Sequence, residues 1–98
     1  MSLPVRLSER AEREVALAIA WHGAQRVGRD RHFIADVERC LKIIARFPRG
    51  AQVVKGNIRQ LPLDRFPYVV VFAIRKKEIS VLSVFNTWQH PRKRFSPR

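Results

Sequence analysis

Residues 57–75 constrain the fold most, because they read as two strands joined by a tight turn. Residues 58–63 are predicted to form the first strand, Asp64 and Arg65 the turn, and residues 67–75 the second strand. The second strand is apolar at nearly every position, which is typical of a strand buried on both faces. Pro67 stands at its start, where the missing amide proton is tolerated. We therefore expect residues 67–75 to run through the middle of a sheet.

Three other segments have strand character. Residues 3–7 alternate between apolar and polar side chains, and Pro4 suits an edge position better than a central one. Residues 79–86 also alternate, which predicts Ile79, Val81, Ser83 and Phe85 on one face of the last strand. Residues 53–54 are apolar but too few to predict a strand.

Two helices are predicted between residues 8 and 48. Ser8 has the character of an N-cap, and an apolar stripe follows at helical spacing: Ala11, Val15, Ala18 and His22. This helix should end near residues 26–28. Asp30 can cap a second helix, whose stripe is Phe33, Val37, Leu41 and Ile44. Pro48 should stop the second helix, because proline lacks the amide proton.

The order strand, helix, helix, strand, strand, strand predicts an α+β fold. The short glycine-containing link at residues 26–28 favours a helical hairpin, which would pack on one face of a mainly antiparallel sheet. At 98 residues the chain is one domain, residues 1–98, with a basic tail over residues 88–98.

The charge of the chain limits its partners. Twenty Lys and Arg residues against eight Asp and Glu residues give a net charge of +12. Such a domain attracts nucleic acid, an acidic protein or an anionic membrane surface. Arginine outnumbers lysine, which favours forked recognition of phosphate or carboxylate. The alternative is that an arginine-rich composition decorates solvated faces, which explains part of the excess but not the shortage of acids.

Other classes of site and location find little support in the sequence. Cys40 is the single cysteine, which fits a reducing compartment, and its apolar helix face indicates a packing residue. The three histidines lack the spacing and the supporting ligands of a metal site, so neither a metal nor a cofactor is expected. Neither a signal peptide nor a membrane span is visible, and a cytoplasmic location is expected.

Several local motifs are distributed over nearly the whole chain. They are Ser8 to Ala11 opening the first helix, Phe47 and Pro48 closing the second, Ile58 and Arg59, Phe66 to Tyr68, Val71 to Ile74, Val81 to Val84, and Pro91 before the basic end. In this order and spacing the chain resembles the ParE/RelE toxin superfamily, and its ParE-like branch more than RelE. The resemblance implies the toxin of a type II toxin–antitoxin (plasmid stabilisation) module.

The resemblance also implies a cognate antitoxin, ParD/RelB-like and acidic, that wraps the toxin. An opposite charge would steer this association. Leu17, Trp21 and Ala24 form an apolar flank of the first helix that could accept a partner helix. The alternative is that Trp21 is ordinary core between the two helices. Operator DNA would be bound only through the antitoxin, and no membrane partner is expected.

RelE-type relatives cut messenger RNA on the ribosome with converging cations and a proton acceptor. The weak catalytic candidates for such chemistry are Lys55, Arg59, His90 and Arg92. The chain departs from the nuclease pattern after its last strand, because no arginine occurs between Arg75 and Arg92. A plain solvated His90 is the alternative to a general base.

ParE-type relatives lack the nuclease residues and poison DNA gyrase. This resemblance favours inhibition of gyrase without an active site in the toxin, and a ribosome-dependent endoribonuclease of RelE type is the alternative. A third interpretation is a non-toxic module that binds only its antitoxin and, with it, DNA. The candidates for contact with the target are Arg59, Arg65, Trp88, Arg92, Lys93 and Arg94. Trp88 could stack on a base or cap the end of the core.

Overall fold

A computed structural model of the chain describes residues 2–88. Its elements are β1 (Val5–Leu7), α1 (Glu9–Gln25), α2 (Arg29–Arg46), the 3-10 turn η1 (Pro48–Gly50), β2 (Gln52–Lys55), β3 (Ile58–Pro62), β4 (Tyr68–Ile74) and β5 (Ile79–Asn86). The predicted α+β order is confirmed. The apolar pair at residues 53–54, too short to predict from sequence, belongs to the additional strand β2.

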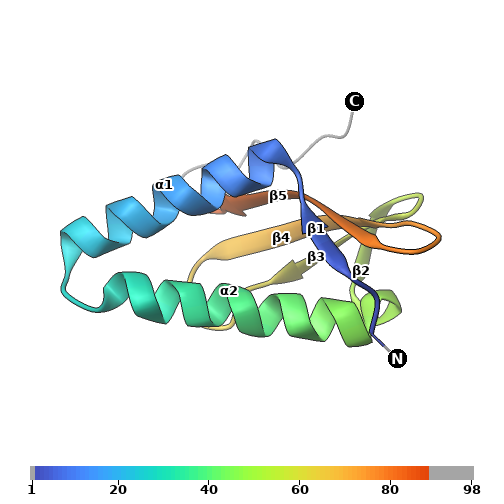
Figure 1. Cartoon of the computed structure of the whole chain (residues 1–98), viewed down its shortest axis with the longest axis horizontal. Coiled ribbons are helices and arrows are strands. Elements are labelled where there is room, and N and C mark those ends of the chain that lie inside the picture. The colour runs from blue at the N-terminus through green and yellow to red at the C-terminus, as the bar shows by residue number, and fades with distance from the viewer. Residues whose placement is uncertain (1, 89–98) are drawn as a thin grey trace.

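The sheet has five strands in the order β1-β5-β4-β3-β2. β4 lies at its centre, as its apolar sequence predicts, and among the strands of residues 2–88 only the β1–β5 pair is parallel. The two helices form a hairpin that covers one face of the sheet (Figure 1). Neither helix among the described residues is both long and apolar enough to cross a membrane.

The helix boundaries follow from local capping. The Ser8 side chain accepts a hydrogen bond from the Ala11 amide at 3.1 Å and caps α1, as predicted. The predicted N-cap of α2 at Asp30 is wrong. Gly28 precedes this helix in the left-handed conformation, with φ of 84°, so α2 begins at Arg29 and Asp30 lies in its first turn. The helix ends at Arg46, two residues before Pro48.

The core lies between the helical hairpin and the sheet. The side chains buried there come from both helices and from the two longest strands, and include Ala11, Ala18, Phe33, Val37, Cys40, Ile44, Val70, Phe72, Ile79, Val81 and Val84. Cys40 is fully buried, which confirms its expected packing role. The predicted stripes of both helices therefore face the sheet.

A β-bulge in β5 changes the predicted alternation. Val71 pairs with Ser83 while its neighbour Phe72 pairs with Val81, so Leu82 is an extra residue. The prediction that Ile79, Val81, Ser83 and Phe85 share one face is therefore wrong beyond Leu82. The extra residue instead turns Val84 into the core beside the helices.

Side chains near the start of α1 bind the bulge. The Ser8 hydroxyl donates to the Leu82 carbonyl at 3.1 Å. The Glu14 carboxylate accepts the Ser83 hydroxyl at 2.8 Å and the Val84 amide at 3.0 Å. These bonds satisfy polar groups on the part of β5 that extends beyond β1 and fix α1 against the sheet edge.

Asp36 fixes the loop between β3 and β4. Its carboxylate is buried in α2 and accepts hydrogen bonds from the amides of Asp64, Arg65 and Phe66 at 3.1, 2.8 and 3.2 Å. Burial alone would raise the pKa of Asp36, but these three amides and the Arg39 guanidinium together lower it. The ionised carboxylate thus holds the loop that forms one wall of the site described next.

Candidate partner-binding groove

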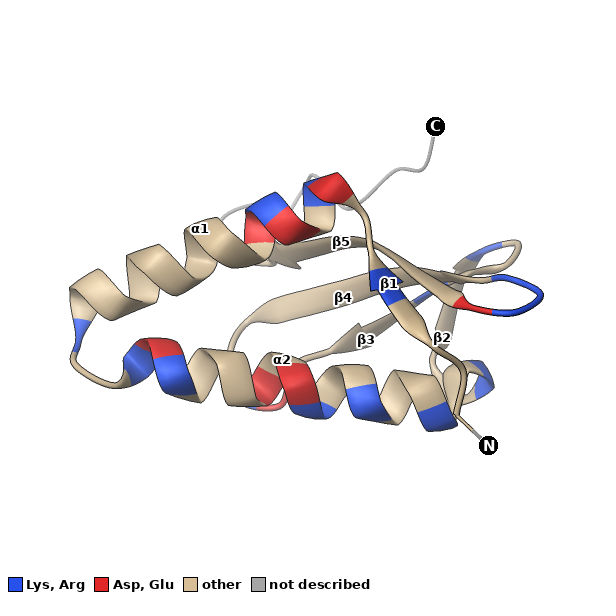
Figure 2. Cartoon of the chain, viewed as in Figure 1, with Lys and Arg blue, Asp and Glu red and all other residues tan. Residues whose placement is uncertain are grey.

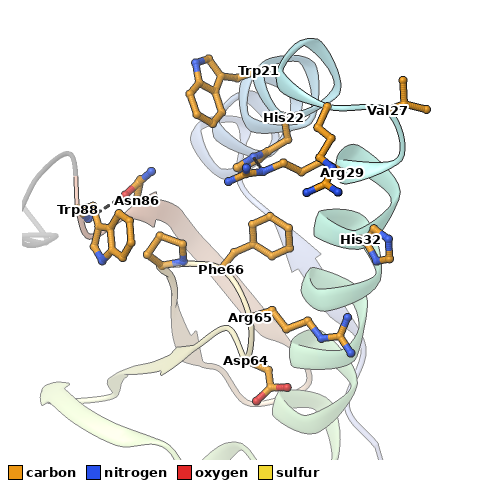
Figure 3. Close-up of a pocket in the computed structure, with 12 residues that line it drawn as sticks. Trp21, His22, Val27, Arg29, His32, Asp64, Arg65, Phe66, Asn86 and Trp88 are labelled. Carbon is orange, nitrogen blue, oxygen red and sulfur yellow. Dashed lines mark hydrogen bonds between the residues drawn. The ribbon is translucent and has the colours of Figure 1, made fainter.

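An open cleft of about 890 Å³ lies where the linked ends of the two helices meet the β3–β4 loop and the end of β5. Figure 3 shows the residues around it, which are mostly cationic or aromatic. They are Trp21, His22, Arg26, Val27, Arg29, His32, Asp64, Arg65, Phe66, Pro67, Asn86 and Trp88. We call this cavity the cationic cleft.

His22 forms the polar centre of one wall of the cationic cleft. It is almost fully buried, with Arg29 Nε donating to its Nδ1 at 3.0 Å and Tyr68 Oη 3.1 Å from its Nε2. Because a guanidinium only donates, Nδ1 must be the accepting nitrogen, and Nε2 carries the proton and donates to Tyr68. Burial and the charge of Arg29 lower the pKa of His22, and burial raises the pKa of Tyr68. Both side chains are therefore neutral at physiological pH.

Aromatic rings enclose this pair. The ring centroids of Trp21, Phe33 and Phe66 lie 4.9, 5.0 and 5.0 Å from that of His22. The Arg29 guanidinium carbon lies 5.9 Å from the Trp21 ring and 5.7 Å from the Phe66 ring. These contacts hold a half-buried guanidinium in one place.

The charge of Arg29 is not neutralised by any described residue. Within residues 2–88 the ion pairs are Arg6–Glu78, Arg10–Glu14 and Arg39–Asp36. The one side-chain hydrogen bond that the Arg29 guanidinium forms with a described residue goes to a neutral ring nitrogen. A forked cation that is fixed but not paired is suited to bind a carboxylate or a phosphate.

A second, smaller cleft of about 270 Å³ continues along α1 and β5. It is lined mainly by apolar side chains: Glu14, Leu17, Ala18, Trp21, Tyr68, Val84, Phe85 and Asn86. Trp21 and Asn86 line both cavities, so the two adjoin at these residues. We call the second cavity the apolar cleft, and the two together the groove.

The predicted partner flank lies on this groove in part. Leu17 is 71% exposed and Trp21 48% exposed, and both line the apolar cleft. Trp21 is therefore not ordinary core between the helices. Ala24 is exposed but lines neither cleft.

The predicted target contacts are divided between different parts of the molecule. Trp88 is 81% exposed and lines the cationic cleft together with Arg65. Arg59 lies elsewhere, with its guanidinium donating to the carbonyls of Arg49 and Ala51 at 3.1 and 2.8 Å. It thereby ties β3 to the turn η1.

Lys55 and Arg65 lie beyond opposite ends of β3, so the structure does not bring these two cations together. The other predicted site residues, His90, Arg92, Lys93 and Arg94, lie outside the described part of the chain. Among residues 2–88, no three His, Cys, Asp or Glu side chains gather as metal ligands would.

The sequence prediction missed three important members of the site: Arg29, Tyr68 as the partner of His22, and Asp36. The sequence carried a signal for the contact between Tyr68 and His22, and another for Asp36. His22 continues the inward stripe of the first helix, and Asp36 lies between Phe33 and Val37 on that of the second. A polar side chain on a buried stripe requires a hydrogen-bonding partner, although the sequence does not say which one.

The fold was compared with known proteins. No family model and no curated protein matches this sequence. A chain of the solved structure "Chromosomal ParDE TA system from P. aeruginosa" matches with a TM-score of 0.67 and 20% sequence identity. The match covers 87% of this chain and 96% of that one. The predicted fold, which the chain was expected to share with the ParE/RelE superfamily, is thereby confirmed.

Proposed function

We propose that this chain is the toxin of a type II toxin–antitoxin module, is held inactive by an acidic antitoxin and acts on DNA gyrase. The observation that carries the proposal is the fold shared with a chain of a ParDE toxin–antitoxin structure over nearly its whole length. The groove adds support, because it combines an exposed apolar side with a cationic side. An antitoxin with apolar residues and acids would complement both sides.

Leu17 and Trp21 are the proposed anchors for the antitoxin. Large apolar side chains exposed side by side on a helix are typical of a surface that another chain covers. Trp21 also lies next to Arg29, so an antitoxin that covers the indole reaches the cation as well. Operator DNA would then be contacted by the antitoxin and not by this chain.

The choice of gyrase over RNA cleavage is supported by the positions of the cations. Lys55 lies in the strand before β3, Arg59 binds backbone carbonyls, and neither lines the groove. Cleavage of RNA requires several cationic hydrogen-bond donors at one point, where they stabilise the charge that develops on the scissile phosphate. Poisoning a topoisomerase requires only a complementary surface, and the second half of α2 carries three exposed cations, Arg39, Lys42 and Arg46 (Figure 2).

The first test is growth. The chain is expressed alone and together with the product of a neighbouring acidic reading frame. We expect growth arrest in the first case and rescue in the second. Normal growth of cells that contain the folded chain alone would exclude both toxin mechanisms and leave a non-toxic binding module.

The second test identifies the target. Purified chain is added to purified gyrase, and supercoiling and cleaved DNA are measured. We expect loss of supercoiling with accumulation of cleaved DNA. Normal supercoiling together with fragmented messenger RNA in arrested cells would instead establish the RelE-type nuclease.

The third test concerns the basic tail. We expect Arg92→Glu combined with Arg94→Glu to abolish toxicity and to leave antitoxin binding intact. Lys76→Glu with Lys77→Glu, in the exposed turn between β4 and β5, makes the same charge change and should remain toxic. Full toxicity of the tail variant would exclude these arginines as target contacts.

A further inference from the structure

The two halves of the groove differ in chemistry, so a bound partner can lie in it in one orientation only. Its apolar half contains Leu17, Ala18 and Val84, and its cationic half contains Arg26, Arg29 and Arg65. Trp21 stands where the halves meet. A partner that fills both halves must place apolar side chains at one end and negative charge at the other.

Arg29 differs from the other cations of the groove in being held from three sides. His22 accepts a hydrogen bond from its Nε, and the rings of Trp21 and Phe66 lie near its guanidinium. Arg26 and Arg65 are exposed, and neither donates a side-chain hydrogen bond to another described residue. A fixed fork loses less conformational freedom on binding than a mobile one, so Arg29 is the stronger receptor for an anion.

The fixation of Arg29 depends on two buried residues, His22 and Tyr68. His22 can accept from Arg29 only while its Nδ1 is unprotonated, and Tyr68 Oη favours this tautomer by accepting from Nε2. The neutral pair supplies no negative charge to cancel that of the guanidinium. Asp64 is the one acid that lines the cationic cleft, and it forms no ion pair within residues 2–88.

We propose that Arg29, positioned by Tyr68 and His22, is the specificity-determining residue of the groove and binds a carboxylate of an apolar–acidic segment of a protein partner. The inference rests on the proposed binding of an acidic partner and adds the chemistry of its recognition. A protein segment suits the groove better than a nucleic acid, because the apolar cleft is lined mainly by apolar side chains and by no cation among residues 2–88. An apolar side chain of a protein segment would cover the exposed Leu17, whereas a sugar–phosphate backbone would not.

The test is a selection of random peptides displayed on phage against the immobilised full-length chain. We expect the selected peptides to carry apolar residues and an Asp or Glu at a constant spacing from them. The affinity of such a peptide should fall about tenfold or more in Arg29→Gln, because a charge-assisted hydrogen bond is lost. Arg31→Gln makes the same charge change at an exposed position of the same helix outside both clefts, and should bind as the parent does.

A double-mutant cycle separates recognition from general attraction. Replacing the peptide's acid by Gln or Asn should weaken binding to the parent about tenfold and have no further effect on Arg29→Gln. Arg29→Lys, which keeps the charge but not the fork, should also bind weakly. Denaturant unfolding of each variant shows whether it is folded. Tyr68→Phe removes only the hydroxyl that lies 3.1 Å from His22 Nε2, and it should weaken the same peptide while shifting the ring-nitrogen resonances of His22.

The proposal would be overturned by peptides without a fixed acid, by equal affinity for the parent and Arg29→Gln, or by a selection that enriches nothing. Binding of a short oligothymidine strand that depends on Arg29, without selected peptides, would assign the groove to nucleic acid instead. These outcomes do not depend on toxicity. If the chain poisons gyrase but selects no peptide whose binding depends on Arg29, only this inference is excluded. If the chain is not toxic but selects such peptides, only the proposed action on gyrase is excluded.

Discussion

The guanidinium of Arg29 donates from Nε to Nδ1 of His22 across 3.0 Å, so a fixed charge at the surface is supported by a neutral, buried ring. The ring has its second partner in Tyr68, 46 residues further along the chain. This contact joins the helical hairpin to the central strand at the site itself. Its dependence on the neutral ring makes it sensitive to pH.

Acid should destabilise the fold through His22. Burial and Arg29 lower the pKa of His22 in the folded chain, so below about pH 6.5 the unfolded chain binds a proton that the folded chain excludes. The free energy of unfolding should therefore decrease between about pH 6.5 and the lowered pKa, by at most about 1.4 kcal/mol per pH unit. Urea unfolding at a series of pH values from 8 to 5 measures this decrease in the free energy of unfolding. His32→Gln should keep this decrease, whereas the same slope in His22→Gln would show that another group is responsible.

Asp36→Ala should destabilise the chain by about 3 kcal/mol, because three loop amides lose their acceptor. The lowered pKa of Asp36 means that the ionised carboxylate stabilises the fold at neutral pH, and that this contribution is lost as acid protonates it below its ordinary range. Chemical denaturation of the variant at neutral pH checks the loss. Glu38→Ala, at an exposed position of the same helix, serves as the control and should change the stability by less than about 0.5 kcal/mol.

The bulge should couple Glu14 to Ser83. Ser83→Ala alone is expected to cost about 1 kcal/mol, because the buried hydroxyl donates to the carboxylate. In a double-mutant cycle with Glu14→Ala the two losses should not add, and the coupling should be at least about 0.5 kcal/mol. Ser80→Ala, on the same strand but before the bulge, should not couple to Glu14. Additive losses for Ser83 and Glu14 would mean that their hydrogen bond does not stabilise the fold.

Cys40 should be unreactive in the folded chain. Burial raises the pKa of its thiol to about 12, and the side chain is fully enclosed. A thiol reagent at pH 8 should therefore label the chain only when denaturant unfolds it, since the thiolate is the reactive form. Rapid labelling of the native chain would show that the helices open readily over the sheet.

The sequence predicted the elements well where one periodicity decided them. The apolar stripe of each helix can be buried only if the segment is helical, and the continuous apolar run of β4 is that of a strand buried on both faces. Both helices and the central strand therefore agree with the prediction. The N-cap of α2 was misplaced because Asp30 is a good capping residue, and the conformation of Gly28, which starts the helix earlier, has no counterpart in the pattern.

Parts of the fold that depend on distant contacts could not be predicted. Leu82 continues a regular alternation in the sequence, and only the pairing with β4 makes it an extra residue. The importance of Arg29 likewise depends on the fold, because its neighbours are a ring from the preceding helix and a ring from the β3–β4 loop. The sequence shows twenty cations, and among those in residues 2–88 the structure distinguishes Arg29, which two aromatic rings and a histidine hold in place.

The parallel pairing of β1 with β5 has a consequence for the order of events during synthesis. Val5 pairs with Ile79 and Leu7 with Val81, so β1 leaves the ribosome well before its partner β5 is made. The helical hairpin, built from contacts close in sequence, can form earlier. A chain that ends before residue 79 cannot close its sheet, so translation must reach the final strand before any activity that needs the complete fold can appear.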